Sequence, residues 1–106
     1  MNKYDQLAVD LREAQAEANA LYSRSEDGGT CNLDAITLNL RGWRQKEAKE
    51  AIVSAGMNAW KHSHGYFVVN PRTVFSQGNR NTRICQAVSD HMKAKGYDAG
   101  MYFMVD

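Results

Sequence analysis

Apolar residues recur along the first part of the chain at alternating spacings of three and four. This spacing is typical of one face of an α-helix, so it predicts a long amphipathic helix over about residues 3 to 24. Asn2 is the expected N-cap of that helix. The apolar seam consists of Tyr4, Leu7, Leu11, Ala14, Ala18 and Leu21. Such a seam can cover a sheet or pair with a copy of itself, so a homodimer through this helix is one expectation.

The pattern then changes to a period of two. Ile36, Leu38 and Leu40 alternate with small or polar residues, which predicts a strand with one buried face. The next segment, WRQKEAKEAIVSAG, is rich in helix-forming residues and is expected to end at Gly56. MNAWK and GYFVVN flank the short segment HSH, which favours two strands joined by a tight turn.

A third helix and a last strand complete the expected elements. Ile84, Val88 and Met92 define the helix, which stops at Gly96, and AGMYFMV is the strand. The polar stretch PRTVFSQGNRNTR before the helix is expected to be irregular. The order predicts an α+β fold with an antiparallel sheet in the ferredoxin-like βαββαβ order, preceded by the long N-terminal amphipathic helix.

Composition indicates one ordinary globular domain. The chain has 106 residues, of which 43% are hydrophobic and 24% charged. We expect a single domain over residues 1–106, with the helix in 1–24 and the βαββαβ-like core in 35–106. The formal net charge of +1 provides no global field to attract a polyanion or a membrane. Two cysteines, and the absence of any apolar run long enough to span a bilayer, favour a soluble cytoplasmic protein.

The segment DGGTCNL, between the first helix and the first strand, has two interpretations. A Gly-rich turn can present backbone N–H groups to an anion, and a cysteine there can act as a nucleophile. Such an enzyme would use Cys31 with one of the bases His62, His64 or His91. The simpler interpretation, which we prefer, is a turn with Cys31 packed beneath it. The histidines and cysteines lack the spacing of a compact zinc site, so we expect neither a metal nor another cofactor.

Basic and aromatic residues suggest an alternative function, the binding of single-stranded nucleic acid. HGYFVVN resembles the [KR]-G-[FY]-[GA]-[FY]-V strand of the RNA-recognition motif, whose sheet stacks bases on aromatic side chains. This sequence departs from the motif at His64 and Phe67, and the first strand, AITLNL, lacks an aromatic residue. The residues expected to form that surface are Arg44, Trp60, Lys61, Tyr66 and Arg80.

The loop also resembles a motif in small uncharacterised proteins of phages and prophages. In these a Gly-Gly-Thr-Cys-Asn loop leads into a short strand and a Gly-Trp pair, as over Asp27 to Trp43 here. The resemblance implies a mobile-element origin and favours a protein that binds a host protein. Our leading expectation is therefore a non-enzymatic interaction protein whose partner is another protein. Its expected contact surface comprises Asp27, Gly28, Gly29, Thr30, Cys31, Asn32, Asp34 and Trp43.

Overall fold

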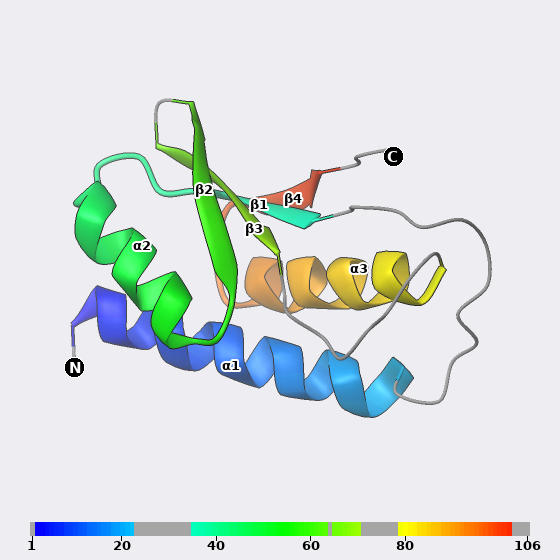
Figure 1. Cartoon of the computed structure of the whole chain (residues 1–106). Coiled ribbons are helices and arrows are strands. Elements are labelled where there is room, and N and C mark those ends of the chain that lie inside the picture. Colours follow the sequence, from blue (N-terminus) through cyan, green and yellow to red (C-terminus); the bar gives the residue numbers. More distant parts are fainter. Residues whose placement is uncertain (1, 23–34, 64, 71–78, 103–106) are drawn as a thin grey trace.

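The computed structural model describes residues 2–22, 35–63, 65–70 and 79–102, and its elements follow the expected order (Figure 1). Residues 103–105 of the predicted last strand and the segment 23–34 lie outside this part of the chain. The helices and strands are α1 (Lys3–Tyr22), β1 (Ala35–Asn39), α2 (Gln45–Ser54), β2 (Asn58–Ser63), β3 (Tyr66–Asn70), α3 (Asn79–Ala94) and β4 (Ala99–Tyr102).

The four strands form one antiparallel sheet in the order β2-β3-β1-β4. β1 and β2 are connected through α2 and lie on either side of β3, while β3 and β4 are connected through α3 and lie on either side of β1. The two helices α2 and α3 therefore each connect two strands that are separated by a third. The predicted mixed α+β class, the antiparallel sheet and the N-terminal helix are confirmed.

One face of the sheet packs on the helices and forms the core. Leu38 on β1 lies opposite Phe67 on β3, and both are buried in the same cluster as Ile52 of α2 and Met92 of α3. α2 and α3 lie beneath the sheet in Figure 1, and α1 packs against these two helices. The chain thus has a sheet layer, a layer of two helices, and a third helix across them.

The apolar seam of α1 packs inside the monomer, against α2 and α3 and not directly against the sheet. Leu7, Leu11, Ala14 and Ala18 are each at most 1% exposed, because they pack into the core formed with α2 and α3. Leu21, the last residue of the expected seam, is 63% exposed. A homodimer through this seam would have to compete with contacts that the chain already makes to itself.

The ends of the helices agree with the sequence. The Asn2 Oδ1 atom accepts a hydrogen bond from the Asp5 N–H at 2.9 Å, as expected of an N-cap. Gly56 and Gly96 both have positive φ, at 86° and 96°. After α3, the Tyr97 N–H donates to the Met92 carbonyl at 3.1 Å, which closes the helix in a Schellman motif.

The start of α3 was predicted wrongly. Residues 79–83, expected to be irregular, form the first turn of the helix. Their polar sequence offers no apolar period, but a first helical turn needs none where it faces solvent, as the exposed side chain of Arg83 shows. No helix in the described part of the chain is long and apolar enough to span a bilayer.

Candidate functional site

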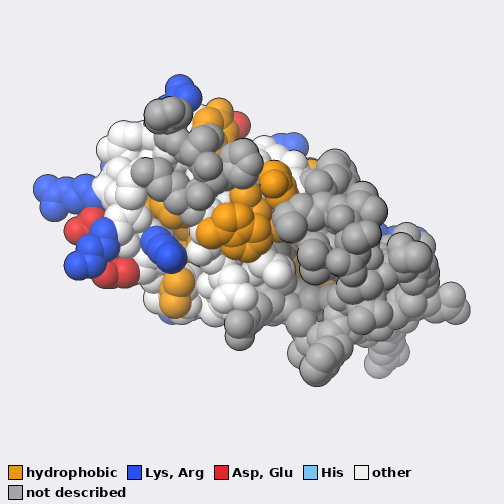
Figure 2. Space-filling view, turned by 45° about the horizontal axis from the view of Figure 1, so that its top comes forward, with side chains coloured by type: hydrophobic (Ala, Val, Ile, Leu, Met, Phe, Trp, Pro, Cys, Tyr) orange, Lys and Arg blue, Asp and Glu red, His pale blue; other side chains and the backbone are white. Residues whose placement is uncertain are grey.

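None of the described helices covers the second face of the sheet. On β3, Phe67 and Val69 point toward the helical core, so the alternation of a strand places Tyr66 and Val68 on the other face. Val68 lies opposite both Trp60 of β2 and Thr37 of β1. We call the surface formed by Thr37, Trp60, Tyr66 and Val68 the open sheet face. Figure 2 shows hydrophobic side chains gathered near the middle of the side of the molecule that lies uppermost in Figure 1.

Trp60 is the most prominent residue of the open sheet face. It is 40% exposed and, with Leu21 and Val53, is one of three large hydrophobic residues exposed in the described part of the chain. Beside it, Val68 is completely buried although it does not face the helices. Because large aromatic side chains are costly to leave in water, Trp60 marks this face as a candidate contact surface.

Tyr66 contributes a second aromatic ring and a neighbouring cation. The Arg41 guanidinium lies over the Tyr66 ring, 5.6 Å from its centroid. The Tyr66 hydroxyl accepts a long hydrogen bond of 3.5 Å from the Asn39 side chain, which also donates to the Asp98 carboxylate at 3.0 Å. The sequence pattern predicts Trp60 and Tyr66 as part of a nucleic-acid surface. The register of β2 and β3 places both residues on the same face of the sheet.

Gly65 determines how closely the turn before β3 approaches Arg41. Its φ is +86°, and a Cβ added there would lie 2.9 to 3.1 Å from the Cγ, Cα and backbone N atoms of Arg41. The Leu40 N–H also donates to the Gly65 carbonyl at 2.8 Å. Glycine is therefore required at this position both for its conformation and for the space it leaves.

Trp43 lies away from the open sheet face, in an aromatic cluster that holds α1 to the rest of the fold. Its ring packs edge-on against Tyr4 at 5.3 Å and, tilted, against Tyr97 at 6.5 Å. The Lys3 ammonium lies 4.6 Å from the centroid of the Trp43 ring. Trp43 is half-buried and packs against the core, so it has a structural role whether or not it also contacts a partner.

The other residues proposed from sequence are distributed as follows. The loop from Asp27 to Asp34, including Cys31, lies outside the described residues. Arg44 is exposed at the start of α2, and its backbone N–H donates to the Tyr4 hydroxyl at 2.9 Å. Lys61 belongs to β2, whereas Arg80 belongs to the first turn of α3, which in Figure 1 lies at the opposite end of the molecule from the start of α2. The backbone positions of the proposed cations therefore belong to separate elements of the fold.

A polar network joins α1 to the end of α3, and sequence reasoning missed it. Asp10 is only 3% exposed; its carboxylate accepts hydrogen bonds from the Tyr97 hydroxyl at 2.6 Å and from the Gln6 amide at 2.9 Å. Burial, followed by the hydrogen bond and charge of Asp10, raises the pKa of Tyr97 well above its usual value. The signal in the sequence is the position of Asp10, which directly precedes the buried seam residue Leu11.

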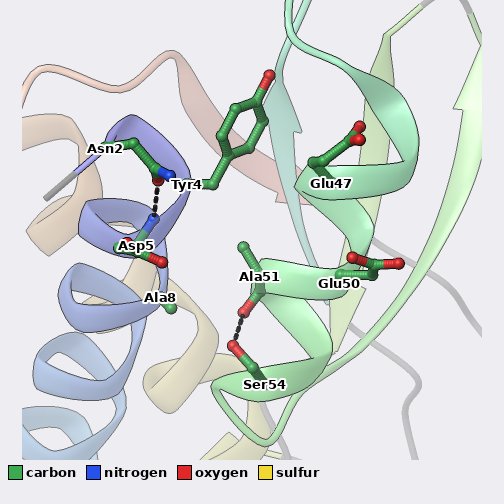
Figure 3. A pocket seen from close by; sticks show the side chains of 8 residues that line it. All are labelled: Asn2, Tyr4, Asp5, Ala8, Glu47, Glu50, Ala51 and Ser54. Atoms are coloured by element: carbon green, nitrogen blue, oxygen red, sulfur yellow. Dashed lines mark hydrogen bonds between the residues drawn. The ribbon is translucent and has the colours of Figure 1, made fainter.

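A groove of about 340 Å³ runs between α1 and α2 (Figure 3). Ala8 and Ala51 are among its lining residues, with the carboxylate of Asp5 on the α1 side and those of Glu47 and Glu50 on the α2 side. This arrangement is favourable for a cation, but within the described residues no three metal-ligating side chains are grouped closely enough to hold a metal ion. Cys85 and His91, which the sequence raised as ligands or bases, are respectively buried in the core and paired with Glu17 at 3.1 Å.

Comparisons with known proteins found no match to a protein-family model, to a curated protein or to a solved structure. The fold and the site define only a class of protein: an α+β domain whose sheet has one face that no described helix covers, with Trp60 exposed and Tyr66 half-buried on it.

Proposed function

We propose that this protein is a small non-enzymatic interaction module that binds a protein partner through the open sheet face. The observation that carries the proposal is Trp60, a tryptophan 40% exposed on a sheet face without a helix. Tryptophan is enriched among the few residues that dominate binding energy at protein interfaces. The loop from Asp27 to Asp34 remains a proposed part of the contact surface, and its resemblance to phage proteins keeps a host protein as the proposed partner.

We also propose that the βαββαβ part of the chain has the ferredoxin-like arrangement. The support is the strand order β2-β3-β1-β4, in which α2 and α3 each connect two strands across a third. In that arrangement both connecting helices cover one face, which leaves the other face available for a ligand. The proposed fold and the proposed binding surface are thus consistent with each other.

A change of one side chain should separate binding from folding. We expect Trp60→Ser to reduce capture of the partner from a host extract at least tenfold, the size of effect typical of a hot spot, with little change in the melting temperature. Quantitative mass spectrometry of affinity-purified material, with wild-type and variant baits side by side, measures this. Val53→Ser is the matched control, since Val53 is 54% exposed but lies on α2. Equal capture by wild type and Trp60→Ser would reject the open sheet face as the binding surface.

Single-stranded nucleic acid is the second candidate ligand. The specific observation in its favour is that Trp60 and Tyr66 share the open sheet face and that a guanidinium lies over the Tyr66 ring. Bases stack on such rings in single-strand-binding proteins. Against it, the beginnings of α3 and α2, which carry Arg80 and Arg44, lie at opposite ends of the molecule in Figure 1, and the net charge is only +1.

We expect no oligonucleotide binding tighter than about 10 μM at physiological salt, which is the range of non-specific affinity. Fluorescence anisotropy with single-stranded and double-stranded DNA and RNA measures it across a salt series. Binding to several phosphates would show as an affinity that falls steeply with salt, whereas a protein interface centred on an aromatic residue responds less. Tight, salt-sensitive binding that Trp60→Ala removes would make nucleic acid the ligand.

A further inference from the structure

The outer surface of α2 carries two rows of opposite charge. Successive residues of an α-helix are about 100° apart around its axis. Lys46 and Lys49 therefore lie on one flank of this surface and Glu47 and Glu50 on the other, while the buried residues of α2 lie on the remaining side. Both lysines and Glu50 are exposed, and Glu47 is half-buried. One helix thus presents a basic flank beside an acidic flank.

These four charges are not used inside the described part of the chain. None of them makes an ion pair with a described residue. Lys46 and Glu50 are four positions apart, a spacing at which helical side chains can pair, but no ion pair joins them. On the neighbouring helices, by contrast, Lys95 of α3 pairs with Glu13 of α1 at 3.5 Å. Both signs of charge on α2 remain available to another molecule.

The two flanks border two hollows. The groove between α1 and α2 lies on the acidic flank (Figure 3), and a second hollow of about 450 Å³ lies on the basic flank. Lys46, Lys49 and Val53 line the second hollow, and Glu50 and Ser54 line both. Val53 is 54% exposed and gives the surface an apolar contact. A contact between identical surfaces must complement itself, and a ridge between a basic and an acidic hollow does so.

We propose that two copies of this chain associate through the outer surfaces of α2, about a two-fold axis parallel to the helices. The two α2 helices then run in the same direction, so the basic flank of each copy faces the acidic flank of the other at the same height. Lys46 and Lys49 of one copy lie near Glu47 and Glu50 of the second copy, and the symmetry repeats this pairing. An antiparallel pair would place like charges opposite each other. The net charge of +1 adds little repulsion between the copies.

This interface is separate from the other surfaces of the molecule discussed above. It leaves the seam of α1 in the core, so it differs from the dimer expected from the spacing of that seam. It also leaves Trp60 uncovered, because Trp60 lies on β2. The dimer carries two open sheet faces and can bind a multivalent partner with avidity. The inference does not rest on the proposed function.

Reversal of the charges on each flank tests this inference. Analytical ultracentrifugation over a series of protein concentrations measures the dimer dissociation constant. We expect the parent to dimerise with a constant below about 1 mM, because exposed ion pairs contribute little each, and to dissociate more readily at high salt. Lys46→Glu with Lys49→Glu, and separately Glu47→Lys with Glu50→Lys, should each weaken association at least tenfold. An equimolar mixture of the two variants should form a heterodimer, because the flanks are then complementary again.

Arg83→Glu with Lys93→Glu is the matched control. Both residues are exposed on α3, and the change in net charge equals that of the lysine variant of α2, so this control should dimerise like the parent. Circular dichroism measures the folding of every variant. A parent that is monomeric at about 1 mM, a dimer that survives both reversals, or a mixture that stays monomeric would overturn the proposal. Trp60→Ser should leave the dimer intact, so either result for the dimer leaves the proposed function to its own test.

Discussion

Replacing Leu11 by aspartate is expected to unfold the protein. Leu11 is completely buried between α1 and the helices of the core. Loss of a buried leucine side chain alone costs about 2–5 kcal/mol, and burying an unpaired carboxylate adds to that cost. Because domains of this size are stable by only about 5–15 kcal/mol, the folded state should lose most of its stability. Circular dichroism and urea titration measure the loss.

Leu21→Asp is the matched control for this change. Leu21 lies on the same helix and was assigned to the same seam, but it is 63% exposed, so its substitution should leave the stability nearly unchanged. Light scattering measures the oligomeric state of the parent and of both variants. A Leu11→Asp variant that stays folded would contradict the packing of α1 against α2 and α3; a folded monomer derived from a larger parent would identify the seam as an oligomer contact.

Gly65→Ala should cause the second-largest loss of stability. A non-glycine residue at positive φ costs about 1–3 kcal/mol, and the added Cβ would also meet the Arg41 backbone at 3.0 and 3.1 Å. Backbone atoms cannot move aside as the end of a side chain can, so we expect a total of about 2–4 kcal/mol. The shift should be visible in both thermal and urea unfolding.

The variant Gly42→Ala separates the cost of a positive φ from the cost of the close approach to Arg41. Gly42 has a φ of +82°, nearly that of Gly65, but an added Cβ there would meet no atom within 4 Å. This variant should therefore show the conformational cost alone, about 1 kcal/mol. Similar losses for both glycines would mean that the close approach to Arg41 is not a constraint. A larger loss for Gly65 would show that the close approach to Arg41 adds to the conformational cost.

The helices and strands could be predicted because the patterns that specify them involve residues close together in the chain. The three-and-four spacing of α1, the alternation of β1, and the glycines at 56 and 96 each depend on neighbours in the chain. The start of α3 was missed because the sequence of residues 79–83 has no apolar period. Local pattern therefore identifies an element better than it identifies its end.

The candidate site was predictable in part. Trp60 and Tyr66 were singled out from their residue types and neighbours, but only the pairing of β2 with β3 places them on one face. Trp43, expected at a contact surface, packs against Tyr4, which is far from it in sequence. The hydrogen bond between Asp10 and Tyr97 likewise joins residues 87 positions apart. Contacts at such separations have no local signature.

The sequence by itself determined the type and order of the described helices and strands, and most of the apolar residues that are buried in them, such as Leu7, Leu11 and Ile36. Only the tertiary structure decided what those residues are buried against. The seam of α1 could have covered a sheet or a second copy, and it covers α2 and α3. The physical reason is that hydrophobic burial is not directional: a seam requires an apolar partner but does not specify which one. The choice, and with it the open sheet face around Trp60, depends on how all the elements pack together.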